Sequence, residues 1–255
     1  MAERSSYQPG TPCWVDLGTP DAEAAARFYG GLFGWEAAID PRPEAGGYGM
    51  FTLGGRNVAG VGPQMGAGPP SWSVYVSVSD LEATAARITA RGGQVVHGPM
   101  DVLDAGRMVV ATDDLGSPLS LWQPGEHIGA QVVNQPGAFV WNELGTAELA
   151  RSTEFYTSVF GWALGGDGAS DQGASFTVAG QVVCGAHATG PGEPTGWSVW
   201  FSVEDCDASA RQATDLGGSV VVAPDDMGFG RGAVVADPHG AAFGIGAMKA
   251  ASGPG

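Results

Sequence analysis

Polar and apolar residues alternate over residues 12–18, and this period of two predicts a β-strand. Trp14 and Asp16 would then share one face of that strand. Residues 19–33 open with helix-capping chemistry and repeat apolar side chains at helical spacing, which predicts an amphipathic helix. Three short strands follow, the last two joined by a Gly-Gly hairpin, so residues 11–64 form one β-α-β-β-β module.

The same pattern recurs over residues 71–123, and the second half of the chain repeats both modules. Residues 13–35 and 140–162 align in register, so Trp14 matches Trp141 and Asp16 matches Glu143. Two such modules set edge to edge would close a curved half-barrel sheet around a cup, with the helices outside. The sequence therefore predicts an α+β fold of four βαβββ modules in two tandem domains, each with its own core and cup. The predicted boundaries are a flexible N-terminal arm (1–10), a first domain (11–123), a linker (124–136), a second domain (137–249) and a disordered tail (250–255).

The composition indicates a globular chain and argues against some classes of binding partner. Hydrophobic residues make up 44% and charged residues 15% of the 255 residues, which is too apolar for a disordered chain. The net charge of −16, with only 11 basic residues, argues against binding to nucleic acid or to an anionic membrane surface. No apolar run approaches the roughly 18 residues that a membrane helix needs. Three widely spaced cysteines and a polar N-terminus predict a cytoplasmic protein without a signal peptide.

Four segments carry a resemblance to a known family: WVDLGTPDAEAAARFYGGLFGW, SVYVSVSDLEATAARITARGG, GRMVVATDDLGSPLSLWQP and GRGAVVADPHGAAFGIG. They resemble the strand-helix units and hairpins of the vicinal oxygen chelate superfamily, which includes glyoxalase I, extradiol dioxygenases, fosfomycin resistance enzymes and bleomycin-binding proteins. The resemblance spans about residues 11–249, and the tandem form looks most like actinobacterial glyoxalase-like proteins. It implies two glyoxalase-like half-barrels and is weaker for function, because one fold hosts many chemistries.

The resemblance also implies where a divalent metal would be bound, because the family's enzymes carry their ligands on inward strand positions. In this sequence those positions are Trp14, Gly60, Ser73 and Ser120 in the first domain, and Trp141, Gly185, Ser198 and Gly244 in the second. None is a His, a Cys or a carboxylate, whereas a good site for Zn²⁺, Fe²⁺ or Mn²⁺ needs three or more such groups. The histidines fall at strand ends, in the linker and in a turn, where solvated side chains are expected: His97, His127, His187 and His239. We therefore expect no metal and no other cofactor.

Two carboxylates are the candidate catalytic residues. Asp16 and Glu143 each share a strand face with the Trp two residues earlier, so each would stand beside an indole in a partly dry cup. Desolvation there would raise the carboxyl pKa and make the group a useful acid or base near neutral pH. The alternative is a structural one, in which each carboxylate accepts hydrogen bonds and only braces the cup.

Aromatic and hydroxyl side chains share the same inward faces and are the candidate ligand-binding residues. Flat aromatic walls with a few polar groups are typical of small-molecule pockets, although the same rings could simply fill a core. Two arginines at matching strand starts could reach an anionic ligand or form surface or interdomain salt bridges. The set comprises Trp14, Ser73, Tyr75, Ser120, Trp141, Ser198, Trp200, Arg107 and Arg231.

The functional prediction is a metal-free protein that binds a small aromatic or partly apolar metabolite, as in sequestration of a natural product or antibiotic. A cofactor-independent lyase or isomerase that uses Asp16 or Glu143 is the alternative, and a metal-dependent glyoxalase or dioxygenase is a third. The expected partner is a small-molecule ligand, with the protein a monomer or a homodimer. Either one cup or both could function.

Overall fold

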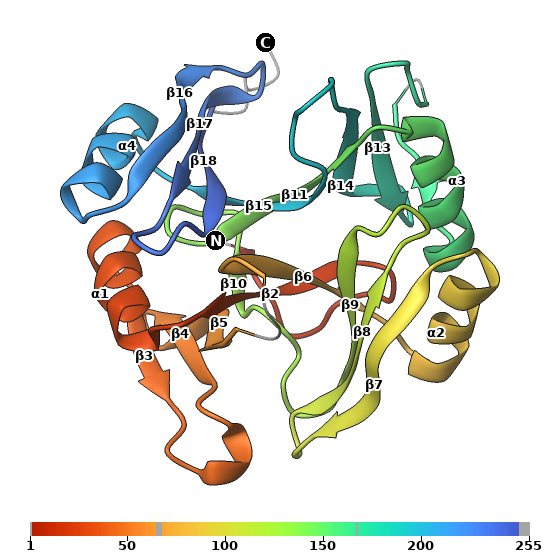
Figure 1. Cartoon of the computed structure of the whole chain (residues 1–255), viewed down its shortest axis with the longest axis horizontal. Helices are drawn as coiled ribbons and strands as arrows, with labels where there is room; N and C mark the ends of the chain where they lie inside the picture. Colours follow the sequence, from red (N-terminus) through yellow and green to blue (C-terminus); the bar gives the residue numbers. More distant parts are fainter. Residues whose placement is uncertain (1, 65–67, 167, 250–255) are drawn as a thin grey trace.

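The computed structural model describes residues 2–64, 68–166 and 168–249 and shows two eight-stranded mixed sheets. The first sheet comprises β2 (Pro12–Thr19), β3 (Glu36–Ile39), β4 (Gly49–Leu53), β5 (Arg56–Pro63), β6 (Ser71–Ser77), β7 (Gln94–Val102), β8 (Gly106–Thr112) and β9 (Pro118–Pro124). The second comprises β11 (Phe139–Thr146), β12 (Ala163–Leu164), β13 (Gly173–Val178), β14 (Gln181–Ala188), β15 (Gly196–Ser202), β16 (Ser219–Asp226), β17 (Gly230–Ala236) and β18 (Ala242–Met248). The helices are α1 (Ala22–Phe33), α2 (Leu81–Ala90), α3 (Leu149–Phe160) and α4 (Cys206–Asp215), with one 3₁₀ turn at Pro43–Ala45. The four βαβββ modules and the α+β class are therefore confirmed (Figure 1).

Each sheet joins two modules through their first strands. The strand orders are β3-β4-β5-β2-β6-β9-β8-β7 and β12-β13-β14-β11-β15-β18-β17-β16, so β2 and β11 lie near the centres of their sheets. Antiparallel pairing sets Asp16 opposite Ser73 in the first sheet and Glu143 opposite Ser198 in the second. Because the registers match, any difference between the two inner faces comes from side chains and not from the backbone plan.

Short polar signals begin and end the helices. The side chains of Asp21, Asp80 and Asp205 accept a hydrogen bond from the backbone N–H three residues later, which caps α1, α2 and α4. Gly34 and Gly161 end α1 and α3 in the left-handed conformation that favours glycine. The matched caps explain why the sequence repeat produces matched helices.

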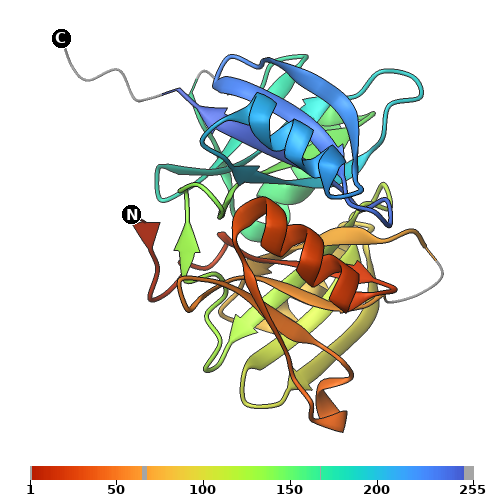
Figure 2. The ribbon, with the colours of Figure 1, turned by 90° about the vertical axis from the view of Figure 1, so that its left-hand side faces the viewer.

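The hydrophobic core lies between the two sheets and is shared by both halves of the chain. One cluster of buried residues joins the first and fourth modules, and a second joins the second and third modules. Figure 2 shows α1 and α4 side by side, and α2 packs against α3 in the same way at the other end. The prediction of a separate core in each domain is wrong, since each buried cluster contains side chains from both halves of the chain and the helices contact the other half as well as their own sheet.

A repeated three-residue network links the two halves. The Trp72 indole donates to Tyr29 Oη at 3.1 Å, and Tyr29 Oη donates to Asp237 Oδ2 at 3.3 Å. In the matching network, the Trp197 indole donates to Tyr156 Oη at 2.9 Å, and Tyr156 Oη donates to Asp113 Oδ2 at 3.0 Å. Asp113 and Asp237 also accept backbone N–H groups of their own turns, so each hairpin turn is anchored to the opposite half.

The N-terminal segment, predicted to be a flexible arm, makes specific contacts with the rest of the chain. Ala2–Glu3 forms strand β1, which pairs with β10 (Val132–Val133) of the interdomain linker. Tyr7 Oη donates to the Ala130 carbonyl at 2.7 Å, and the Trp162 indole donates to the Gly10 carbonyl at 2.7 Å. The predicted tail, 250–255, lies outside the described residues. Within the described ranges, no helix is both long and apolar enough to span a membrane.

Candidate functional site

The inner face of the second sheet brings a carboxylate, an imidazole and two indoles together. Trp141 and Glu143 lie on β11, His187 on β14, and Trp200 on β15. The Trp141 indole donates to Glu143 Oε2 at 2.5 Å, while His187 Nδ1 lies 3.4 Å from Glu143 Oε1. Each carboxylate oxygen of Glu143 thus has its own aromatic nitrogen neighbour. We call these residues and the strands that carry them the second cup.

Ser198 and Phe229 complete this arrangement. Ser198 Oγ donates to the backbone carbonyl of Glu143 at 3.1 Å and accepts from the Trp200 indole at 3.3 Å. Phe229 packs edge-on against Trp200, with ring centroids 5.9 Å apart. The hydroxyl therefore links the Trp200 indole to the backbone of Glu143, and the indole and Phe229 pack together as an aromatic wall.

Glycines on the neighbouring strands make room for these side chains. A Cβ added at Gly185 would overlap Glu143 Oε2, and one added at Gly244 would overlap the Trp200 indole. The two glycines pair directly with Glu143 and Trp200 across the sheet. The carboxylate and the indole thus occupy the space where side chains of positions 185 and 244 would otherwise stand.

Glu143 is partly buried but remains open to solvent. Its side chain is 22% exposed and that of His187 is 48% exposed. Burial raises the pKa of Glu143 above its ordinary value, while hydrogen bonds from Trp141 and His187 and the nearby imidazole act in the opposite direction. Among the described residues, no Arg or Lys forms an ion pair with this carboxylate. Glu143 is therefore a reachable carboxylate of increased basicity.

The matching positions of the first sheet form a closed cluster, which we call the first cup. Asp16 Oδ2 accepts hydrogen bonds from Tyr75 Oη at 2.8 Å and from Tyr48 Oη at 3.2 Å. The Trp14 indole donates to Tyr48 Oη at 3.0 Å. Burial raises the pKa of Asp16, and the hydroxyl groups of Tyr75, Ser73 and Tyr48 oppose that rise.

Tyr48 and His127 cover the first cup. The Tyr48 side chain lies directly over Gly60 and Gly62, where an added Cβ would overlap it. The His127 ring, from the linker, packs edge-on against Trp14 with centroids 4.5 Å apart, and burial lowers the pKa of His127 to about 4. The carboxylate below is accordingly bonded and covered, which matches the bracing role that the sequence left open for it.

The chain was compared with known proteins. The sequence model of the Glyoxalase/Bleomycin resistance protein/Dioxygenase superfamily matches residues 13–121 and 135–245, one match in each half. The chain belongs to this superfamily.

Similar proteins and similar solved structures agree with the assignment to this superfamily. The chain is 41% identical over 254 residues to CFP32 of Mycobacterium tuberculosis (strain CDC 1551 / Oshkosh), whose name marks it as a candidate glyoxylase; the match covers 96% of this chain and 97% of that protein. It is 39% identical over 260 residues to the anthracycline biosynthesis protein DnrV of Streptomyces peucetius, covering 94% of each chain. The Mn(II)-bound glyoxalase from Novosphingobium aromaticivorans superposes with a TM-score of 0.66 at 14% identity, covering 95% of this chain and 83% of that one, which shows the shared fold alone.

The cups do not fit the divalent metal that glyoxalase-superfamily enzymes hold. Glu143 and His187 are two potential ligands in the second cup, and Asp16 in the first is already bonded to two phenols. Over the described ranges, no group of three or more His, Cys, Asp or Glu side chains is arranged to hold an ion. The described side chains of the two cups therefore do not form a set of ligands for a divalent metal, and a metal-free protein stays a prediction.

Two histidines that the sequence predicted to be solvated contact residues of the two cups. His187 was expected to be solvated but lies beside Glu143. His127 was expected to be solvated in the linker but is partly buried and packs against Trp14 and Trp122. Counting by two from Gly185 along β14 would have found His187. His97 lies within β7, which extends to Val102, and is exposed.

The two arginines predicted to bind ligand lie away from both cups. Arg107 pairs with Glu82 at 2.6 Å and with Asp101 at 3.0 Å, and Arg231 pairs with Asp207. Glu82 and Asp207 are in the first turns of α2 and α4, so these guanidinium groups face the helices. Both arginines therefore form the salt bridges that the sequence left open as the alternative to ligand binding.

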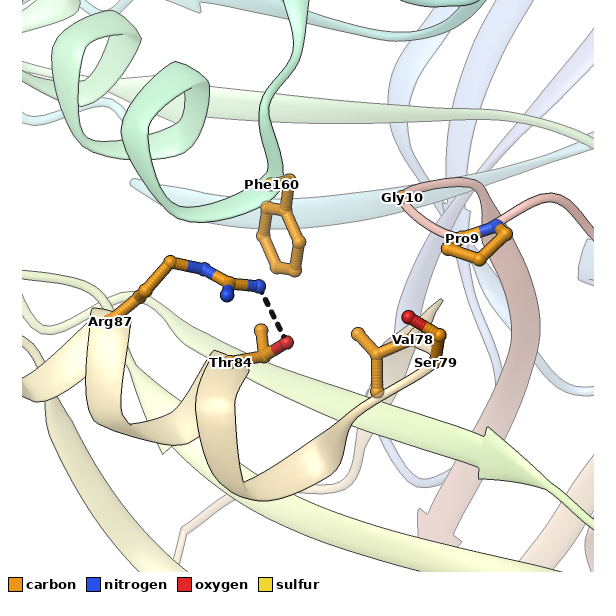
Figure 3. A pocket seen from close by; sticks show the side chains of 7 residues that line it. All are labelled: Pro9, Gly10, Val78, Ser79, Thr84, Arg87 and Phe160. Atoms are coloured by element: carbon orange, nitrogen blue, oxygen red, sulfur yellow. Dashed lines mark hydrogen bonds between the residues drawn. The ribbon is translucent and has the colours of Figure 1, made fainter.

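A cavity of about 210 Å³ lies between α2 and the end of α3, and none of its lining residues belongs to either cup. Figure 3 shows these residues: Pro9, Gly10, Val78, Ser79, Thr84, Arg87 and Phe160. Arg87 lines it, and its guanidinium donates to the Val159 carbonyl at 2.8 Å and to Thr84 Oγ1 at 2.8 Å. At the other helix pair, Gln212 donates to the Gly31 carbonyl at 2.8 Å. Arg87 therefore ties α2 to the end of α3 as part of the repeated interface, and the second cup remains the better candidate site.

Proposed function

We propose that this protein binds a flat, partly apolar aromatic metabolite in its second cup. The observation that carries the proposal is the partly exposed aromatic wall of Trp141, Trp200 and Phe229 around an accessible carboxylate. Indole and phenyl faces provide stacking area, and a carboxylate without an Arg or Lys partner accepts a hydroxyl donor from a ligand. The favoured ligand is therefore an aromatic compound with at least one phenolic hydroxyl.

The similarity to DnrV supports this ligand class. That relative is named for anthracycline biosynthesis, and anthracyclines are flat, fused-ring aromatic compounds with phenolic hydroxyls. The match covers 94% of each chain, so it includes both cups. Binding alone would serve sequestration or delivery of such a compound without any metal.

The test is a titration of the protein with 1,4-dihydroxyanthraquinone, followed by quenching of tryptophan fluorescence and by calorimetry. We expect saturable binding that weakens by about 5- to 160-fold in Trp200→Leu, since base-sized stacking surfaces contribute roughly 1–3 kcal/mol. Tyr75→Phe changes the matching position of the first cup and serves as the control, with binding unchanged. Equal affinities of wild type and Trp200→Leu would contradict the proposal.

Elemental analysis of the purified protein separates this proposal from metal-dependent glyoxalase or dioxygenase chemistry. The donor sets of both cups favour a protein without stoichiometric metal. A divalent ion at one equivalent per chain would favour the metal-dependent alternative instead.

A further inference from the structure

We infer that the second cup is also a proton-transfer site, in which Glu143 removes a proton from a carbon next to the carbonyl of a bound aryl-fused ketone. The inference rests on the proposed function, because the ketone has to bind beside the aromatic wall. It assigns a reaction, enolisation, to a substrate class, aromatic carbon acids.

The carboxylate of Glu143 has one oxygen fixed by a hydrogen bond and one oxygen with free lone pairs. The Trp141 indole fixes Oε2 at 2.5 Å, which sets the plane of the carboxylate. Oε1 faces His187 at 3.4 Å, a long contact that leaves lone pairs of this oxygen available. A base has to be positioned and still have a free lone pair, and Glu143 meets both conditions.

His187 provides a path between the carboxylate and solvent. Its ring contacts Glu143 Oε1 at 3.4 Å and is itself about half exposed, so it meets both the carboxylate and bulk water. An imidazole can accept a proton at one nitrogen and release another at the second. His187 thus acts as a positioning and relay residue that returns Glu143 to its ionised form after each transfer.

The residues around Glu143 and His187 do not compete with them for the transferred proton. On β14, Cys184 is fully buried and its thiol pKa is raised well above the ordinary value by burial and by the Glu143 charge, so the thiol stays protonated. β15 contributes Ser198 and Trp200, and β18 contributes Gly244, none of which carries a charge. The proton therefore moves between substrate carbon, Glu143, His187 and water.

The step balances without an oxidant or a reductant. The Glu143 carboxylate takes the proton, the C–H electron pair forms the C=C bond of the enolate, and the carbonyl π pair moves onto oxygen. Return of a proton to the same carbon gives exchange with solvent, and its return to another carbon of a conjugated substrate gives an isomer. Asp16 does not support the same step, because two phenols occupy its carboxylate beneath the Tyr48 cover.

The experiment measures deuterium incorporation into 2-tetralone, an aryl-fused ketone, by proton NMR in buffered D₂O. Wild type is expected to accelerate exchange over buffer by about 10²-fold or more, the usual range for a positioned acid or base. Glu143→Gln should fall to the buffer rate while retaining binding of 2-tetralone by tryptophan quenching. Asp16→Asn, the matched carboxylate of the first cup, should keep the wild-type rate within about twofold.

His187→Gln distinguishes a relay from a structural role. The variant should have a lower maximal exchange rate, and that rate should depend less on pH and buffer concentration. Added imidazole should restore the rate if His187 relays protons. If the loss is purely structural, added imidazole should have no effect. Exchange no faster than buffer with bound 2-tetralone, or a wild-type rate in Glu143→Gln, would overturn the inference and leave ligand binding intact. Failure of both 2-tetralone and 1,4-dihydroxyanthraquinone to bind would overturn the proposed function and this inference together.

Discussion

The first and second cups share a backbone plan and differ in what surrounds their carboxylates. In the first, two phenol hydroxyls bond to Asp16, and Tyr48 and His127 cover it. In the second, one indole holds Glu143 and a half-exposed imidazole faces its other oxygen. Equivalent acids in duplicated halves thus have different chemistry, because neighbouring groups and solvent decide what a carboxyl can do.

Much of this difference comes from one position, which is a glycine in the first cup and a histidine in the second. Gly62 and His187 hold matching places, since they pair with Gly18 and Gly145 of the matched strands. In the first cup the Tyr48 ring covers Gly62, whereas in the second that place carries the imidazole itself. The comparison predicts that the first cup contributes to stability and the second to function.

The largest predicted effect on stability concerns His127 at acid pH. Burial lowers the pKa of His127 from its ordinary value of 6.5 to about 4, so the folded state disfavours the protonated ring. The stabilisation is complete above pH 6.5 and is lost as the pH falls toward 4, because the unfolded chain takes up the proton first. The free energy of unfolding of wild type should fall by about 3 kcal/mol relative to His127→Gln over this range. Chemical denaturation at several pH values checks this, and parallel curves for the two proteins would show that the linker histidine does not close the first cup.

Two matched glycines test the contrast directly. Gly60→Ala should destabilise the protein by about 2 kcal/mol, because its Cβ would overlap the Tyr48 hydroxyl and ring and crowd Asp16. Gly185→Ala should cost less than about 1 kcal/mol, since the Glu143 carboxylate that it displaces is partly exposed and can turn toward solvent. Thermal denaturation of both variants measures the difference. A larger loss for Gly185→Ala would reverse the roles assigned to the cups.

The smallest predicted effects come from the exposed arginines. Arg107→Ala and Arg231→Ala break solvent-screened ion pairs at the helix starts and should each leave the free energy of unfolding close to that of wild type. Binding of 1,4-dihydroxyanthraquinone should stay at wild-type affinity in both. A tenfold loss of affinity in Arg231→Ala would place that arginine at the ligand after all.

Much of the fold followed from local patterns in the sequence. Alternation placed Asp16 and Glu143 on the faces of Trp14 and Trp141, and the observed registers agree with that counting. The shared core could not be found in this way, because a helical apolar stripe does not reveal which half of the chain covers it. The networks of Tyr29 with Asp237 and Tyr156 with Asp113 join residues 208 and 43 positions apart, respectively.

The site was less predictable than the fold for a similar reason. His127 lies in a linker without periodicity, and its burial depends on how the linker crosses the first sheet. Tyr48 precedes a strand, so its reach over Gly60 depends on the approach of that segment. Of these three residues, only His187 could have been predicted from the sequence, because it lies two positions after Gly185 on the same strand and so shares its face.

The most direct test of the account is a crystal structure of the protein with 1,4-dihydroxyanthraquinone bound. We predict density for the ligand in the second cup, stacked on Trp200, with a hydroxyl within hydrogen-bond distance of Glu143 and with Tyr48 still bonded to Asp16. Ligand density in the first cup with Tyr48 displaced, or in the interdomain cavity beside Arg87, would contradict the account.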